Sequence, residues 1–320
     1  MRGLLTLSMC CVLTFVGRAA AAAATTATAP TSRLYKLSLP GTHGPPGRWF
    51  LQPPGEVTVR IAAPSAAVEW TFSHADTVLA SGALQAGANR PAELRLTIPE
   101  VRRRALCLLT VTRRGATARQ EMVIFPRRLF GPLRARLNAR HVGVLQSLLN
   151  SQLRQDYYTG QVLLVAGWQK REAITAAMSG LSALLRRGAC VVPLDPPAGL
   201  DAWALRTVPR PPGGRVNLAG ALAKLVTPDD LAGRLPRRAG RTEASDKLLA
   251  WIQPPPAARH KKDIPSPPSA GLVFCRRIGR GHLVVSVLQQ TAHPDTDPLG
   301  RAVLAGMLNE IVGLNPTTRP

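Results

Sequence analysis

His293 and Asp295, separated by one proline, are residue types suited to hydrolytic catalysis. A carboxylate beside a histidine can hold the imidazole ring in one tautomer and stabilise its protonated form, so that the histidine works as a general base. Such a base also needs a nucleophile to activate. The pair alone therefore does not distinguish a catalytic fragment from a loop that closes a sheet, and the elements that position it must be considered.

Strand-like and helix-like stretches alternate in residues 140–316. The apolar runs 161–167 and 189–195 lack polar alternation and predict buried strands, while the periodic stretch 170–188 between them predicts a helix that ends at Gly188. Strand, helix and strand in this order are typical of a parallel sheet covered on both faces. The sequence therefore predicts an α/β domain.

The rest of this domain is less regular. It contains a helical stretch at 218–226, a proline-rich loop at 252–271, and two strands joined by the turn "IGRG" (278–281). A closing helix is predicted at 298–314.

Four residues follow strand-like runs of this domain. Trp168 and Asp195 come after the first two runs, and His293 and Asp295 come after the last. Ligands bind sheets of this type beyond the carboxyl ends of the strands. We therefore expect these four residues to surround one ligand crevice. The alternatives are that Trp168 packs on a neighbouring loop and that the His293–Asp295 pair is structural.

Residues 56–126 have a different pattern. Short β-like runs follow one another at regular spacing, and Val57, Val59 and Ile61 alternate with polar residues. This spacing predicts an all-β sandwich of immunoglobulin-like type, with Trp70 in its core. An extended lead-in at 31–55 precedes the sandwich, and a basic connector at 127–139 follows it.

Residues 1–30 have the features of a signal peptide. Met1 and Arg2 give a positively charged start, and residues 3–17 form an apolar core too short to span a bilayer comfortably. Residues 18–30 are rich in alanine and offer small-residue cleavage points. We expect export to the periplasm or the cell exterior, with no transmembrane segment after cleavage; the alternative is an uncleaved anchor.

The chain is strongly basic, with 41 Lys and Arg against 18 Asp and Glu, a formal charge of +23. Aromatic residues make up only 4% and the basic residues are scattered, which does not fit nucleic-acid binding. A positive surface on an exported protein instead favours contact with anionic envelope polymers. The alternative is that the arginine content reflects the base composition of a GC-rich genome.

Three cysteines remain after the signal segment: Cys107, Cys190 and Cys275. They lie in or at the start of apolar runs, their number is odd, and no Cys-x-x-Cys or His/Cys cluster is present. This pattern predicts buried free thiols rather than a disulfide framework. No metal and no cofactor are expected.

The tail carries a resemblance to a known family. "CRRIGRGHLVVSVLQQ" (275–290) followed by "LGRAVLAGMLNEIV" (299–312) resembles the end of the class I glutamine-amidotransferase-like superfamily, in its degenerate exported bacterial branch. "VLLVAGW" (162–168), "GLSALLRRGACVVPLDP" (180–196) and "LLAWIQPP" (248–255) are similar to other parts of that family. The resemblance covers about 128–316 and implies a flavodoxin-like α/β fold.

The family's catalytic position is not retained. Active members carry a nucleophilic cysteine on a tight glycine-flanked turn, where the helix dipole and backbone N–H groups lower the pKa of the thiol. The matching stretch here is 194–197, with neither a Cys, Ser or Thr nor a glycine, and Cys190 comes too early. No catalytic residue is therefore expected.

These observations favour an exported, non-enzymatic binding or scaffolding protein, with a glycan or another protein as its partner. One alternative is a hydrolase of sugar or amide substrates that uses a crevice with Asp195 and His293. A second alternative is cationic adhesion to anionic envelope polymers through the arginine excess.

Overall fold

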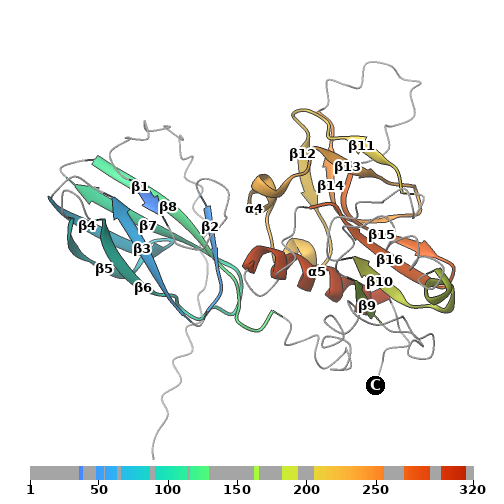
Figure 1. Ribbon diagram of the computed structural model, residues 1–320, viewed down its shortest axis with the longest axis horizontal. Coiled ribbons are helices and arrows are strands. Elements are labelled where there is room, and N and C mark those ends of the chain that lie inside the picture. Colours follow the sequence, from blue (N-terminus) through green and yellow to red (C-terminus); the bar gives the residue numbers. More distant parts are fainter. Residues whose placement is uncertain are drawn as a thin grey trace, which may run out of the picture.

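The computed structural model (Figure 1) describes residues 36–38, 48–53, 55–62, 66–86, 91–113, 116–129, 162–165, 182–193, 205–255, 270–288 and 297–314. The described residues are 54% strand and 17% helix. Two of its three sheets form an N-terminal sandwich, and the third belongs to a second domain. None of the described helices is long and apolar enough to cross a membrane.

The sandwich consists of a three-stranded and a five-stranded sheet. The smaller sheet has the order β1 (Lys36–Ser38), β3 (Glu56–Ala62), β6 (Ala92–Thr97), and the larger β2 (Arg48–Leu51), β8 (Ala116–Ile124), β7 (Ala105–Arg113), β4 (Ala66–His74), β5 (Thr77–Ala86). Only the β2–β8 pair is parallel among these described strands. β3 and β6 thus share one sheet, and β4, β7 and β8 share the other. Immunoglobulin-like sandwiches divide their strands in the same way, with strands B and E in one sheet and strands C, F and G in the other.

Alternating apolar residues build the core between these two sheets. β6 alternates buried and exposed side chains along its whole length, as expected for a strand with one face in solvent. Val59 and Leu94 of the smaller sheet belong to one cluster with Phe72 and Leu109 of the larger sheet. Trp70 packs against this cluster while remaining partly exposed.

The second domain is built on an eight-stranded sheet. Its main path is β11 (Thr207–Pro209), β13 (Arg238–Arg241), β15 (Ala270–Ile278), β16 (Gly281–Ser286), β10 (Cys190–Pro193), β9 (Val162–Val165), and β14 (Lys247–Gln253) joins β15 to β12 (Arg215–Leu218). The helical elements include residues 182–187, η3 (Leu222–Lys224), α4 (Pro228–Leu231), η4 (Ala232–Arg234) and α5 (Pro298–Leu314).

The predicted flavodoxin-like α/β fold is wrong. In the described part of this sheet only β9, β10 and β16 run parallel, and the other pairings are antiparallel. An unbroken apolar run indicates a strand buried on both faces, but it does not specify the direction of the neighbouring strand. Four further strands, β11 to β14, lie in the stretch for which the sequence predicts one helix and loops. The domain is therefore mainly antiparallel β.

The helix predicted at 218–226 is also wrong. Leu218 is the last residue of β12, and Gly220 adopts a left-handed conformation with a φ of 60° that breaks a helix. Only the short η3 follows. Pro228 then disfavours helical geometry at the preceding residue and instead stands at the start of α4. Periodic apolar residues were present here, but local backbone geometry prevented the helix.

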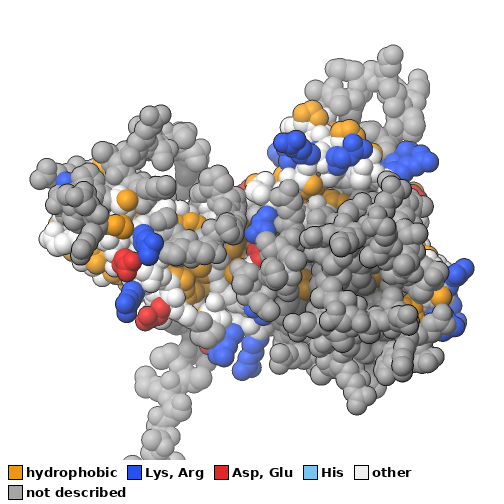
Figure 2. Space-filling model, in the orientation of Figure 1, with side chains coloured by type: hydrophobic (Ala, Val, Ile, Leu, Met, Phe, Trp, Pro, Cys, Tyr) orange, Lys and Arg blue, Asp and Glu red, His pale blue; other side chains and the backbone are white. Residues whose placement is uncertain are grey.

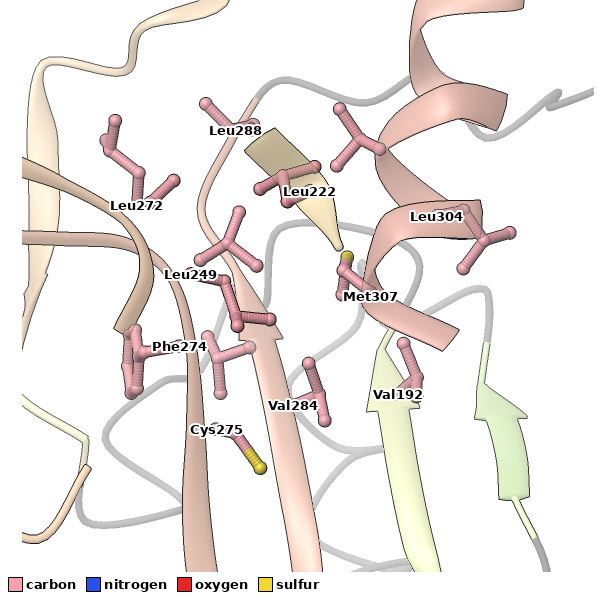
Figure 3. Packing of buried hydrophobic residues seen from close by; sticks show 14 of the residues in the cluster. Val192, Leu222, Leu249, Leu272, Phe274, Cys275, Val284, Leu288, Leu304 and Met307 are labelled. Atoms are coloured by element: carbon pink, nitrogen blue, oxygen red, sulfur yellow. The ribbon is translucent and has the colours of Figure 1, made fainter. Parts of the chain in front are cut away.

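The closing helix α5 covers the apolar sheet. Figure 3 shows Met307 of α5 and Leu222 beside Val284 of β16 and Val192 of β10, and all four side chains are fully buried. Burial of a side chain such as Met307 contributes about 1.5–3 kcal/mol to stability. This packing, together with the β15–β16 hairpin, confirms that the tail forms two strands and a helix.

The two domains meet at a buried junction. Phe50 of β2 and Phe125, just beyond β8, stack with ring centroids 6.2 Å apart and belong to the same apolar cluster as the second domain's sheet. Beside them, the fully buried carboxylate of Asp230 accepts hydrogen bonds from Arg104 (2.7 Å) and Arg48 (3.1 Å). A carboxylate of one domain thus lies between two guanidinium groups of the other.

Candidate functional site: an arginine-lined pocket

The four residues of the predicted crevice, Trp168, Asp195, His293 and Asp295, all lie outside the described residues. The strands that precede them are described: β9, β10 and β16 are parallel and end at Val165, Pro193 and Ser286. Their carboxyl ends share one edge of the sheet. The predicted gathering of the four side chains at that edge, and the alternative hydrolase that depends on it, stay predictions.

A different site lies within the described residues. A pocket of about 350 Å³ is lined by Arg206, Arg241, Glu243 and Arg276. Arg206 immediately precedes β11, Arg241 is the last residue of β13, and Arg276 lies near the end of β15. The backbone N–H of Arg241 donates to the carbonyl of Arg206 at 2.7 Å. Strand pairing therefore places the first two arginines side by side.

Arg276 is the fixed member of this pocket. Its Nε and Nη2 donate to the two carboxylate oxygens of Asp246 at 2.9 and 2.7 Å, and its Nη1 lies 3.1 Å from Glu243. The guanidinium also lies 6.0 Å from the ring centroid of Phe274. Hydrogen bonding to Asp246 raises the pKa of Arg276 against the opposing effect of burial. A bidentate pair of this kind fixes the guanidinium plane.

Arg206 and Arg241 are in a different situation. Both are exposed, and neither forms an ion pair with any carboxylate in the described part of the chain. The guanidinium groups of Arg206, Arg241 and Arg276 therefore have only two described carboxylates near them, those of Glu243 and Asp246. The carboxylate of Asp246 is fully buried. The pocket carries an excess of positive charge at its open side. Such an arrangement can bind an anion through planar donor forks.

Glu243 adds an acceptor to the same pocket. Its side chain is 63% exposed and its backbone N–H donates to Asp246 at 2.8 Å, which fixes the loop between β13 and β14. A free carboxylate oxygen can accept a hydrogen bond from a hydroxyl group of a ligand. The pocket thus combines sites for a negative group and for a hydroxyl donor.

The three cysteines do not contribute to this site. Cys107, Cys190 and Cys275 are free and buried, which confirms the prediction of buried thiols. Burial raises the pKa of the Cys190 thiol to about 11, so it is not an activated nucleophile. No group of three His, Cys, Asp or Glu side chains suited to a metal ion is found among the residues described.

Sequence reasoning did not find the pocket. Its three arginines lie in or next to three different strands, each 35 positions from the next along the chain, without a shared motif. The arginine excess was visible, but arginines with and without acidic partners look alike in a sequence. The only local signal is "RTEASD" (241–246), in which one arginine and two acids lie in a short loop.

Comparison with known proteins adds no assignment. The chain matches no protein-family model, and no similar sequence is found among curated proteins. The chemistry of the pocket is therefore inferred from its own residues.

Proposed function

We propose that this protein is an exported binding protein for anionic glycans, with the pocket of Arg206, Arg241 and Arg276 as its binding site. The observation that carries the proposal is the pair of arginines without carboxylate partners in the described chain, held beside an arginine that Asp246 fixes. Export rests on residues 1–30, and a native N-terminus between about Ala20 and Ala29, measured by mass spectrometry, tests that part.

The chemistry of the pocket favours a hydroxylated acid. Guanidinium forks match the geometry of carboxylate, sulfate and phosphate groups. Glu243 would accept a hydrogen bond from a ring hydroxyl, which a uronic acid residue offers beside its carboxylate. The volume of about 350 Å³ is at the lower end of the range for ligand pockets, roughly 300–1,000 Å³, so one sugar residue is the appropriate occupant.

Calorimetric titration of the full chain with trigalacturonate tests the proposal, with neutral galactotriose as the uncharged comparison. Arg206→Gln and Arg241→Gln should each weaken trigalacturonate binding about tenfold or more, because each removes a charged hydrogen bond worth about 1.5–3 kcal/mol. Galactotriose should bind to none of the proteins.

Arg95→Gln is the matched control, since Arg95 is exposed on β6 in the other domain and the substitution changes the net charge equally. Equal weakening by Arg95→Gln would mean that overall charge, not the pocket, attracts the ligand. No trigalacturonate binding at low salt would contradict the proposed function.

A further inference from the structure

A second group of arginines lies outside the pocket, where the β15–β16 turn meets the helical residues 182–187. All of its members are exposed, and we call them the arginine ridge: Arg186, Arg187, Arg277 and Arg280. Figure 2 shows Lys and Arg side chains gathered at the edge of the second domain. Figure 1 places the turn between the end of β15 and the start of β16 at this edge.

Close packing brings the two parts of the ridge together. Gly279, with a φ of 62°, lies so near the helical segment that a Cβ there would be 3.0 Å from the Cα of Arg186. A Cβ at Gly188 would be 3.9 Å from the Cβ of Arg280. The backbone N–H of His282 donates to the carbonyl of Ala189 at 3.1 Å and holds the turn in place. The fold therefore brings the backbone positions of the four arginines near one another.

No carboxylate in the described part of the chain pairs with any residue of the ridge. The carboxyl end of the helical segment supplies at most about half a negative charge, which is too little to balance four guanidinium groups. Burial is the largest cause of the lowered pKa of the neighbouring His282, and the charges of Arg277 and Lys247 lower it further. Clustered like charges of this kind are unfavourable without a counter-charge.

The pocket extends along β15 toward the ridge: Arg241 pairs with Ala270 at the start of this strand, and Arg276 lies next to Arg277 of the ridge. Lys247, the first residue of β14, pairs with Cys275 near the end of β15, so the β13–β14 loop and the β15–β16 turn are neighbours there. Arg276 and Arg277 are consecutive in β15, and their side chains project to opposite faces. A long anion that extends from the pocket around the end of β15 can therefore contact both groups.

We propose that the arginine ridge binds the chain of a linear polyanionic glycan, one residue of which occupies the pocket. This inference rests on the proposed function for the chemistry of the ligand and extends it from a single acidic sugar to a polymer. Exposed cations on a ridge suit a repeating series of negative groups, because each contact adds to the affinity by releasing counterions. A small ligand would gain nothing from the ridge.

The ridge favours a glycan over a single-stranded nucleic acid. Proteins that bind single strands combine basic grooves with aromatic side chains on which the bases stack. All four ridge residues are arginines, with no aromatic member to stack a base. A single-stranded oligonucleotide is accordingly used as a competitor in the test.

Binding of fluorescently labelled polygalacturonate and of trigalacturonate to the full chain at several salt concentrations tests the proposal. Arg186→Gln/Arg187→Gln should weaken polymer binding about tenfold and make its salt dependence shallower by about one unit per lost contact. Binding of the trimer should not change. Arg277→Gln/Arg280→Gln should behave in the same way, and its thermal unfolding shows whether loss of the hydrogen bond from Arg277 to the Gly279 carbonyl harms the turn.

The controls separate this inference from the proposed function. Arg95→Gln/Arg119→Gln makes the same charge change on two exposed strand positions of the sandwich, and should weaken polymer binding much less. If the trimer does not bind but the polymer binds through the ridge, the pocket proposal fails and the ridge stands. If both ridge variants equal the control, or a single-stranded oligonucleotide of equal charge binds more tightly than the polymer, the ridge proposal is overturned.

Discussion

Single arginines in this chain differ mainly in their partners. Arg276 donates two hydrogen bonds to the buried carboxylate of Asp246, one to each oxygen, so the position of its guanidinium group is fixed before a ligand binds. Arg206 and Arg241 are exposed, and no acidic partner is described for either. A ligand carboxylate would replace only water at these two side chains, which lowers the desolvation cost of binding. Arg276 therefore provides a donor group of fixed orientation, and Arg206 and Arg241 provide positive charge, unpaired within the described chain, for the ligand.

The cysteines provide a prediction at this scale. Burial raises the pKa of Cys107 and Cys190 to about 11, and burial with the nearby Cys190 raises that of Cys275 to about 12. Near pH 8 the thiolate fraction is then roughly a hundredfold or more below that of an ordinary cysteine. We expect a thiol reagent to label all three slowly in the native protein and quickly in urea, as followed by mass spectrometry of peptides. Rapid native labelling of Cys190 would show that its strand opens readily.

Among the elements, α5 depends on one polar anchor in addition to its apolar face. The carboxylate of Glu310 accepts a hydrogen bond from the backbone N–H of Ala221 at 2.9 Å and lies 2.5 Å from Nζ of Lys247. It thereby connects α5 to η3 and to the start of β14. Burial would raise the pKa of Glu310, but these two partners outweigh it and lower the pKa below its ordinary value.

Replacing Glu310 with glutamine tests this anchor. A depressed carboxyl pKa stabilises the fold above the unfolded-state pKa of 4.5, and this stabilisation disappears as pH falls through the folded-state value. Because Lys247 is half exposed, the penalty of Glu310→Gln near pH 7 should be only about 1 kcal/mol, and it should shrink below about pH 4. Urea unfolding at both pH values measures it. Glu93 forms an exposed pair with Arg60, so Glu93→Gln should lower the free energy of unfolding by less than Glu310→Gln does near pH 7. Equal penalties for Glu310→Gln at both pH values would exclude the ionic anchor.

For the whole molecule, the junction between the domains is the decisive contact. Asp230 accepts from Arg48 and Arg104, and it also accepts from the backbone N–H of Thr227 at 2.9 Å, which caps α4. Burial would lower the pKa of Arg48, yet Glu121 and Asp230 raise it overall, so this arginine stays charged. The rings of Phe50 and Phe125 add an apolar stack that belongs to the same cluster as the second domain's sheet.

Asp230→Ala should destabilise the protein by about 3–5 kcal/mol, because it leaves two partly buried guanidinium groups without their carboxylate. Arg104→Gln should cost less, since it removes the bonds that Arg104 donates to Asp230 and Thr227 but keeps the contact with Arg48 and the cap of α4. Denaturant unfolding followed by tryptophan fluorescence measures both variants. We expect Asp230→Ala to separate the unfolding of the two domains into two transitions. A single transition with an unchanged midpoint would show that the contacts of Asp230 neither stabilise the protein nor couple the unfolding of its domains.

Local patterns determined the elements that depend on nearby residues. The alternation in β6 and around Val59 predicted strands of a sandwich, and the turn at Gly279 predicted the β15–β16 hairpin. The apolar periodicity of α5 predicted the closing helix. These features follow from side-chain burial and turn geometry within a few residues, which a sequence displays directly.

Tertiary structure alone decided strand direction and charge pairing. The apolar run of β15 is compatible with parallel or antiparallel neighbours, and in the structure it is antiparallel to β16, β14 and β13. Only the direction of β16 follows from a short turn, at residues 279–280. Likewise Arg206, Arg241 and Arg276 become one pocket only when β11, β13 and β15 lie side by side. Which arginine meets a carboxylate depends on contacts across thirty residues or more, and such long-range pairing leaves no periodic trace in the sequence.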